Sequence, residues 1–207
     1  MISIIIPTLN EEHFLRHTIQ HAMSMASGNV EIEYIVVDAG SQDQTLETIN
    51  DLPVRTYKRP DLILKKYASL NFGIAESNGS IVMLLDADTK LPARFDELII
   101  NELHDEIVVG GSFSYSFQNP DWKLRLLTVI NRIRYQFGRI YYGDQAVFVR
   151  KEIIDQIAGV PEEPLMEVAY LCKRLKRVGK LALVKPGVIT SPRRFIEHGF
   201  FRTFWFD

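Results

Sequence analysis

The sequence predicts a single α/β domain with a mixed, mostly parallel central sheet flanked by helices. In its first half, continuous apolar runs alternate with segments of helical periodicity, the pattern of parallel strands that are buried on both faces. The second half changes to strands with one polar face. The chain has 207 residues, of which 46% are hydrophobic and 24% charged. A domain of this size buries roughly 70% of the surface of its unfolded chain, so one domain is sufficient.

The first half contains four predicted strands and four predicted helices. The strands are short apolar runs followed by turn residues, and the helices repeat apolar residues at helical spacing. In chain order we expect a strand over Ile2–Ile6, a helix over Glu11–Ala26, a strand over Ile32–Val37, a helix capped by Ser41 or Asp43 and ending near Asn50, a strand over Val54–Tyr57, a helix over Lys65–Ser77, a strand over Ile81–Leu85 and a helix from Pro92 to about Leu103.

The second half is predicted to add strands of mixed direction. Aromatic residues and serines alternate over Val108–Phe117, which indicates a strand with one polar face. The remaining expected elements are a helix over Trp122–Phe137, a strand over Gln145–Val149, helices over Lys151–Ile157 and Leu165–Val178, short strands over Leu181–Val184 and Val188–Thr190, and a helical tail from Phe195. No linker or repeat separates these elements.

Cysteine usage and the N-terminus indicate a cellular compartment. The single cysteine, Cys172, cannot form an internal disulfide, which is typical of a reducing compartment. The run Ile2–Ile6 lacks a basic start and is too short for a signal peptide. No apolar run approaches the ~20 residues of a membrane span. We therefore expect a cytoplasmic protein.

Charge is unevenly distributed along the chain. The net charge is −2, but residues 173–207 contain nine Lys and Arg against two acidic residues. A basic C-terminal part suggests an anionic ligand, such as a phosphate or a lipid surface. For Lys173–Lys180 alone, a solvated helix face is the alternative.

Acidic and turn residues follow three of the predicted strands. They lie at Pro7 to Glu12, Asp38 to Asp43 and Asp86 to Asp88. In open α/β sheets, ligands bind beyond the carboxyl ends of the strands, so these segments form the expected site. The sequence lacks the glycine fingerprint of dinucleotide-binding folds, the Walker phosphate loop and the nucleophile elbow of hydrolases, which disfavours those three classes.

Asp86 and Asp88 are the sharpest candidates for a metal site. On an extended chain, residues i and i+2 point to the same side, and two carboxylates there repel each other unless a cation or a donor lies between them. Mg²⁺ shares its coordination shell between carboxylates and substrate phosphates. A helix cap or loop pair is the alternative interpretation of such a short pattern.

Several segments together resemble the family 2 glycosyltransferases, and within them a small bacterial branch. The resemblance spans nearly the whole chain in order. It rests on Ser3-Ile4-Ile5-Ile6-Pro7-Thr8-Leu9-Asn10-Glu11-Glu12, Val36-Val37-Asp38-Ala39-Gly40-Ser41-Gln42-Asp43, Asp86-Ala87-Asp88-Thr89, Tyr142-Gly143-Asp144-Gln145-Ala146-Val147-Phe148-Val149-Arg150, Pro164-Leu165-Met166-Glu167 and Thr190-Ser191-Pro192-Arg193-Arg194-Phe195.

The resemblance implies a GT-A fold and the inverting transfer of a sugar from a nucleotide diphosphate donor, with UDP- or GDP-linked sugars as donors. Residues 1–104 would form the nucleotide-sugar-binding half and 105–207 the acceptor-side half.

The resemblance also implies roles for single residues by their position. Pro7, Thr8 and Glu11 would border the nucleoside, and Asp38 would bind the base. Asp86 would hold the ribose side, and Asp88 would ligate Mn²⁺ or Mg²⁺ on the diphosphate. A helix cap is the alternative for Asp38 and a first-turn carboxylate for Glu11. Lys66, Arg193 and Arg194 are candidate diphosphate-binding residues, since arginine can grip phosphate oxygens in pairs. His198 is a candidate additional metal ligand, with a surface histidine as the alternative.

The general base is where this sequence departs from the family. Relatives usually have Glu-Asp where this chain has Glu167-Val168, and the aspartate is the expected base. Glu167 or Asp144 could take its place. We therefore expect slow transfer that Val168→Asp increases and Glu167→Gln reduces. The alternative function is a degenerate nucleotide-sugar-binding protein. A sugar-phosphate nucleotidyltransferase is disfavoured, because Pro7-Thr8-Leu9-Asn10 is not the glycine-rich phosphate loop of those enzymes.

The acceptor is not identified by the sequence, and we expect no nucleic-acid partner. Two segments are candidates for peripheral membrane contact. One is Trp122–Gly143, which holds five cations and no acid among apolar residues, and the other is the aromatic ending Phe200–Phe206. A basic exposed side of a core-facing helix is the alternative for the first.

Overall fold

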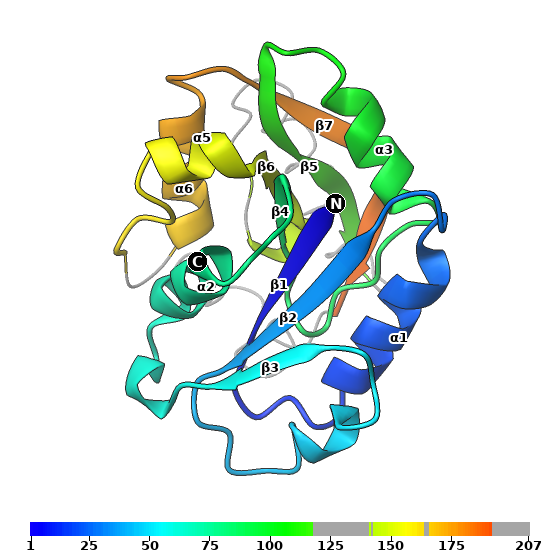
Figure 1. Ribbon diagram of the computed structural model, residues 1–207, viewed down its shortest axis with the longest axis vertical. Coiled ribbons are helices and arrows are strands. Elements are labelled where there is room, and N and C mark those ends of the chain that lie inside the picture. Colours follow the sequence, from blue (N-terminus) through cyan, green and yellow to red (C-terminus); the bar gives the residue numbers. More distant parts are fainter. Residues whose placement is uncertain (118–140, 142, 164–165, 192–207) are drawn as a thin grey trace.

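A seven-stranded sheet forms the centre of the computed structural model, which describes residues 1–117, 141, 143–163 and 166–191 (Figure 1). The strand order is β3-β2-β1-β4-β6-β5-β7. β1 to β4 run parallel to one another, β6 is antiparallel to β4 and β5, and β7 is parallel to β5. The strands are β1 (Ile2–Thr8), β2 (Ile32–Asp38), β3 (Arg55–Lys58), β4 (Ile81–Leu84), β5 (Val108–Phe117), β6 (Val147–Arg150) and β7 (Lys180–Thr190).

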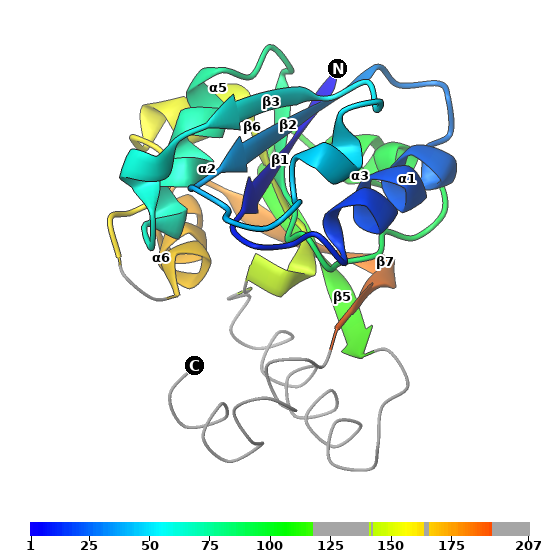
Figure 2. The same ribbon diagram turned by 90° about the horizontal axis from the view of Figure 1, so that it is seen from below.

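Helices cover both faces of this sheet. α1 and α3 lie on one side, and α2, α5 and α6 lie on the other (Figures 1 and 2). The α-helices are α1 (Leu15–Met25), α2 (Lys66–Ala75), α3 (Phe95–Glu102), α5 (Lys151–Gln156) and α6 (Glu167–Leu175), and the 3₁₀ turns are η1 (Glu47–Ile49), η2 (Pro60–Leu62) and η3 (Gly143–Gln145). Within the described ranges, none of the helices combines the length and the apolar character needed to cross a bilayer. The predicted mixed, mostly parallel sheet is confirmed.

The core lies between the sheet and the two helical layers. Ile4, Ile5 and Val82 are fully buried, because strands covered on both faces expose neither row of side chains. Cys172 of α6 is also buried and acts as a packing residue. α2 packs especially close to the sheet, since a Cβ atom added to Gly73 would lie 2.4 Å from Cγ2 of Ile5. α2 therefore lies directly against β1 and β2 near Gly73.

The predicted helix from Ser41 or Asp43 to Asn50 is wrong. Only the 3₁₀ turn η1 forms there. The side chains that were expected to cap a helix are used elsewhere: Ser41 donates its hydroxyl to Asp38, and Asp43 accepts hydrogen bonds from Thr45 and from the backbone of Glu12. α1 begins at Leu15 rather than at Glu11.

Strands near the C-terminal part also differ from expectation. The two short strands over Leu181–Val184 and Val188–Thr190 form one strand, β7, which passes through Pro186 with a register shift against Phe113 and Tyr115. A proline is tolerated there because β7 lies at the edge of the sheet. Gln145 belongs to η3 rather than to β6. The helices expected over Trp122–Phe137 and from Phe195 lie outside the described residues.

A polar network ties β2 to β1, to β3 and to the loop after α2, at the edge of the sheet opposite the carboxyl ends of its parallel strands. The carboxylate of Glu33 accepts hydrogen bonds from Ser3 (2.6 Å), Arg55 (3.0 Å) and Asn78 (2.6 Å). Burial raises the pKa of Glu33, but these hydrogen bonds outweigh burial and lower the pKa to about 2. Glu33 therefore stabilises the folded protein in its ionised form.

Glu33→Gln is expected to lower the free energy of unfolding at pH 7 by on the order of 1–2 kcal/mol, after allowance for solvent screening. Because the folded pKa is depressed, this stabilisation is present above the ordinary value of 4.5 and disappears as the pH falls toward about 2. Urea denaturation of parent and variant across this range measures the difference. If the difference in the free energy of unfolding between parent and variant stays constant from pH 7 to pH 2.5, the charge of Glu33 does not contribute to stability.

Candidate functional site

Three neighbouring strands end in polar residues that lie side by side. In the sheet register, Thr8 of β1 is paired with Asp38 of β2, and Asp38 is paired with Lys58 of β3. Thr8 is buried and donates its hydroxyl to the carbonyl of Ile6 at 3.2 Å. The predicted neighbourhood of Thr8 and Asp38 is therefore present, and Lys58 extends it.

Asp38 closes the turn that follows β2. Its carboxylate accepts hydrogen bonds from the backbone N–H groups of Gly40 and Ser41, both at 3.0 Å, and from the Ser41 hydroxyl. Gly40 has a φ of 101°, a left-handed conformation that favours glycine. Asp38 is 2% exposed. It therefore closes its own loop rather than capping a helix, because no helix begins in the described residues that directly follow it, and it also lines a pocket.

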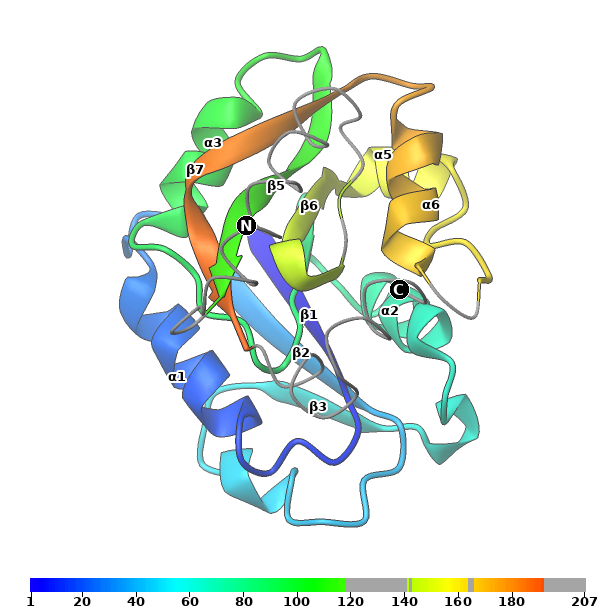
Figure 3. The same cartoon turned by 180° about the vertical axis from the view of Figure 1, so that it is seen from behind.

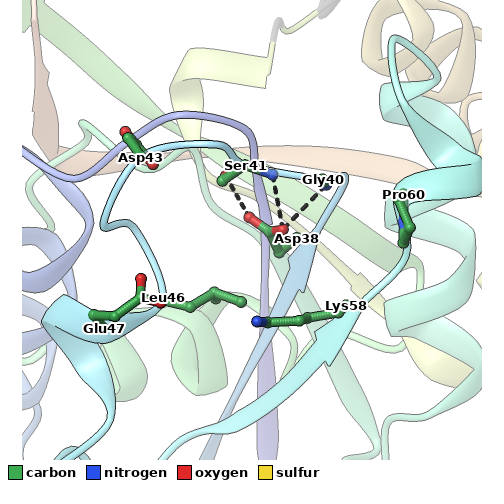
Figure 4. A pocket seen from close by; sticks show the side chains of 8 residues that line it. All are labelled: Asp38, Gly40, Ser41, Asp43, Leu46, Glu47, Lys58 and Pro60. Carbon is green, nitrogen blue, oxygen red and sulfur yellow. Dashed lines mark hydrogen bonds between the residues drawn. The ribbon is translucent and has the colours of Figure 1, made fainter.

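That pocket encloses about 130 Å³ beside Asp38 (Figure 4). Lys58 extends across it toward Leu46, and Pro60 closes the opposite side (Figure 4). Its lining consists of Asp38, Gly40, Ser41, Asp43, Leu46, Glu47, Lys58 and Pro60. Burial raises the pKa of Asp43, but hydrogen bonds from Thr45 and Glu12 outweigh burial and hold that pKa below its usual range. The pocket therefore combines apolar, anionic and cationic side chains.

The loop after β1 is joined to the loop after β2 by side-chain hydrogen bonds. Asn10 donates its N–H to the Ser41 hydroxyl at 2.8 Å and accepts the N–H of Gln42 at 2.9 Å. The N–H of Glu11 donates to the Thr45 hydroxyl at 2.8 Å. Asn10 has a φ of 55°, which asparagine tolerates better than most residues. Glu11 therefore lies in a loop whose shape is set by its partner loop, whereas Pro7 lies within β1, paired with Val37 of β2.

Asp86 and Asp88 follow β4, as predicted, but not on an extended chain. The N–H of Thr89 donates to the carbonyl of Asp86 at 3.2 Å, so the chain turns between the two aspartates. The extended backbone from which the same-side geometry was expected is therefore absent. Both side chains are nevertheless half-buried at the strand end, whereas Ala87 between them is buried.

Lys66 joins the two halves of the chain. Its Nζ atom lies 2.6 Å from Oδ1 of Asp86 and 3.8 Å from Oε1 of Glu167. α2 and α6 lie side by side at this point (Figure 3). Glu167 is 8% exposed. The carboxylate after β4 and the first carboxylate of α6 therefore face one ammonium group, which limits their mutual repulsion.

Gly143 borders the same cluster. A Cβ atom added to it would lie 3.1 Å from Nζ of Lys66 and 3.6 Å from both Oδ2 of Asp86 and Cγ2 of Val168. Asp144, the next residue in η3, has a buried Oδ1 atom. Val168 is 2% exposed and belongs to the hydrophobic core. We call Lys66, Asp86, Gly143 and Glu167 the Lys66 cluster.

Some predicted site residues lie outside the described residues, and two neighbours were missed. The predicted residues outside the described part of the chain are Arg193, Arg194, His198 and most of Trp122–Gly143. The two neighbouring residues that the sequence patterns did not select are Lys58 and Gly143. The strand-end rule that selected Asp38 applies equally to Lys58, which ends β3. For Gly143 no comparable signal exists, because its place depends on how η3 packs against β5, β7 and α6.

The carboxylates after β4 are the candidate metal ligands. Among the residues that the structure describes, no group of three or more His, Cys, Asp or Glu side chains is arranged to hold a metal ion. Mg²⁺ is commonly bound through one or two carboxylates plus substrate phosphates. The half-buried Asp88, with Asp86 nearby in the same turn, fits that donor set.

The fold is the GT-A fold, which the solved structures described below share. Residues 3–156 match the family model described as Glycosyl transferase family 2. The chain belongs to this family.

Solved structures share the fold. The mannosyltransferase PcManGT from Pyrobaculum calidifontis, in complex with GDP-Man and Mn²⁺, superposes with a TM-score of 0.72 at 20% identity over 92% of this chain and 56% of that protein. TarS from S. aureus, in complex with UDP, gives 0.70 at 19% identity over 95% and 62%. Glucosyl-3-phosphoglycerate synthase from Mycobacterium tuberculosis, in complex with Mn²⁺, UDP-Glc and phosphoglyceric acid, gives 0.63 at 21% identity over 92% and 70%.

Sequence relatives are glycosyltransferases of greater length. The probable glycosyltransferase YdaM of Bacillus subtilis is 27% identical over 91% of this chain and 50% of its own length. An uncharacterized glycosyltransferase of Haemophilus influenzae is 26% identical over 86% and 73%. The present chain therefore spans about half the length of its Bacillus relative.

Proposed function

We propose that the protein transfers a sugar, with inversion, from a UDP- or GDP-linked donor to the hydroxyl of an acceptor, with a divalent cation bound at the diphosphate. Family membership and the GT-A fold support sugar transfer in general. The Lys66 cluster supports the finer assignment, because it brings a carboxylate from the nucleotide-binding half, residues 1–104, to one from the acceptor-side half, residues 105–207. A cytoplasmic location remains part of this proposal.

Donor binding is assigned to the ends of the parallel strands. The pocket beside Asp38 would take the base, with Pro7, Thr8 and Glu11 along the nucleoside. Asp86 would hold the ribose side. Asp88 would hold Mn²⁺ or Mg²⁺ against the diphosphate, where the cation would stabilise the charge of the leaving group. Lys66, close to Asp86, would add a positive charge there, and Arg193 and Arg194 remain further candidates for the diphosphate.

Catalysis requires a group that takes the acceptor proton. The acceptor oxygen forms a bond to the anomeric carbon while the bond from that carbon to the diphosphate oxygen breaks, and the nucleoside diphosphate leaves. Glu167 is our candidate for receiving the proton, because its carboxylate lies in the Lys66 cluster opposite the donor-side residues. Asp144 is the second candidate, as the neighbour of Gly143.

A thermal-shift screen of nucleotide sugars with and without Mn²⁺ tests the donor assignment. A ligand at a hundredfold excess over its Kd stabilises the folded protein by roughly 2.7 kcal/mol. A shift with UDP- or GDP-sugars that Mn²⁺ increases is the expected result. No shift with any nucleotide sugar would contradict the assignment.

Asp38→Ala is expected to weaken nucleotide binding at least tenfold without metal, because the pocket loses both a wall and the anchor of its loop. Asp38→Asn is the matched control for shape: it can still accept from Gly40 and Ser41 but lacks the charge. Calorimetric titration with UDP and GDP measures both. Equal affinity of parent and Asp38→Ala would leave Asp38 as a loop cap only.

A nucleotide-sugar-binding protein without efficient catalysis is the second candidate function. Val168 favours it, because a buried apolar side chain stands where relatives have the aspartate base. Slow metal-dependent release of nucleoside diphosphate from the donor would indicate a live centre. Tight donor binding with neither hydrolysis nor transfer would indicate the second function.

A further inference from the structure

The outer face of α6 presents a stripe of one aromatic and three basic residues. Tyr170, Lys173, Arg174 and Arg177 recur at i, i+3, i+4 and i+7, the spacing of one helix face. All four are exposed. Arg177 lies two residues beyond the end of α6, but its N–H donates to the carbonyl of Arg174, which continues the turn. We call these residues the α6 basic stripe.

The opposite face of α6 is buried in the core. Val168, Leu171, Cys172 and Leu175 are each at most 2% exposed. The apolar face of α6 is therefore inaccessible, and the α6 basic stripe is the face that a partner can contact. Tyr170 is 40% exposed and lies under the Lys173 ammonium, which is 4.5 Å from the ring centroid. Val178, 41% exposed, adds an apolar contact at the far end.

Negative charge is scarce around the stripe. The sequence has no acidic residue between Glu167 and Glu197. Within the described part of the chain, no ion pair involves a cation of the stripe. Asp155 of the neighbouring α5 is paired with Lys151. Exposed Lys176 and Lys180 add positive charge, while Asp105 and Glu106, before β5, limit the basic area beyond Lys180.

Helix stability alone does not account for this pattern. A cation near a helix C-terminus interacts favourably with the helix dipole. However, Arg177 lies at i+4 from Lys173 and i+3 from Arg174, and like charges at these spacings repel. A bound anionic surface would remove that repulsion.

We propose that the α6 basic stripe docks the protein on the surface of an anionic lipid bilayer. Basic side chains near such a surface are attracted to its headgroups, and a tyrosine ring suits the headgroup region, where one end is apolar and the other wet. A nucleic acid fits less well, because the chain has a net charge of −2, whereas nucleic-acid-binding domains are strongly basic.

Docking through α6 would bring the site close to the bilayer. α6 begins at Glu167 and its nine residues rise about 14 Å. An acceptor displayed at the bilayer surface would then be near the proposed base. This step rests on the proposed function, whereas bilayer binding itself requires no donor, metal or activity.

Flotation with vesicles tests the proposal. Vesicles of 70% phosphatidylcholine and 30% phosphatidylglycerol should bind the protein at 0.1 M NaCl and release it at 0.5 M, since exposed charges are screened by salt. Vesicles of phosphatidylcholine alone should not bind it. Binding to both vesicle types with equal strength, or to neither, would overturn the proposal.

Substitutions assign the binding to α6. Each cation near the surface strengthens binding roughly fivefold, so K173Q/R174Q/R177Q should weaken binding on the order of 100-fold. The matched control R16Q/R94Q/K185Q changes the net charge by the same amount. Its substitutions lie on α1, just before α3 and on β7, and they should weaken vesicle binding far less. A circular dichroism spectrum checks folding, and Tyr170→Ala provides a single-site variant that should bind severalfold more weakly.

Two outcomes would contradict the assignment. Equal losses in both triple variants would mean that overall charge, and not α6, determines binding. Equally tight, stripe-dependent binding of a duplex DNA oligonucleotide would mean that the stripe recognises polyanions in general. Because the vesicle assay needs no nucleotide sugar, its failure leaves the proposed sugar transfer to be judged by donor binding alone.

Discussion

Glu167→Gln is expected to lower the rate of sugar transfer by about 10²–10⁴-fold, the usual effect of removing a general base, while donor affinity changes little. The amide keeps the shape of the side chain but cannot take the acceptor proton. Lys66, the partner of Glu167, would keep its ion pair with Asp86, in which Nζ lies 2.6 Å from Oδ1. A coupled assay of nucleoside diphosphate release, run with saturating donor, measures the rate.

The matched control is Glu152→Gln, the same chemical change on an exposed residue at the start of α5. A full rate in Glu167→Gln, combined with a large loss in Asp144→Asn, would transfer the role of base to Asp144. Loss of donor binding in Glu167→Gln would instead mean that the residue supports the donor site.

Val168→Asp complements this experiment. Transfer per folded molecule should increase, because an aspartate would stand where relatives have their base. The free energy of unfolding should fall by about 1–3 kcal/mol, because a charged group enters a buried position. Val168→Ala removes the valine side chain without adding a carboxylate. A similar increase in the transfer rate of both variants would therefore show that the space filled by the valine, and not the missing base, limits transfer by the parent protein.

Asp88→Ala is expected to remove the metal-dependent part of nucleotide diphosphate binding. Loss of an outer-shell partner typically weakens metal binding 10–100-fold, and loss of a direct ligand should exceed that. The free energy of unfolding should change little, since the Asp88 side chain is only half-buried. Calorimetry with UDP and GDP, in Mn²⁺ and in EDTA, separates the two contributions.

Asp105→Ala, on an exposed turn, is the control for an altered net charge. If Asp88→Ala still gains affinity on addition of Mn²⁺ as the parent does, the metal is held by other groups. If it loses affinity equally in EDTA, Asp88 contacts the nucleotide directly.

Sequence patterns predicted the sheet because its strands are locally distinctive. Ile81–Leu85 is a continuous apolar run and Ile2–Ile6 is interrupted only by Ser3, and burial on both faces explains these runs. The expected helix after Ser41 failed because Ser41 and Asp43 bind distant loop atoms instead of a helix end. Local propensity cannot anticipate a competing partner that lies about 30 residues away.

The candidate site was predictable only in part for a similar reason. The rule that ligands lie beyond strand ends selected Asp38, Asp86 and Asp88 from single segments. The meeting of Lys66 with Glu167 depends on the packing of two helices that are about 100 residues apart in sequence, which no local pattern encodes. The burial of Val168 is likewise a property of that packing.

The hydrogen bonds between the loops after β1 and β2 have a consequence for the energetics of ligand entry. Residues 10–12 and 41–45 hold one another through Asn10, Ser41 and Thr45 before any ligand arrives. Ordering a loop residue on binding forfeits backbone entropy of roughly 1–2 kcal/mol, and a prearranged wall avoids most of that loss. Such a wall also couples the two loops mechanically, so a ligand that shifts one must shift the other. These hydrogen bonds therefore tie the rim of the pocket to the loop after β1.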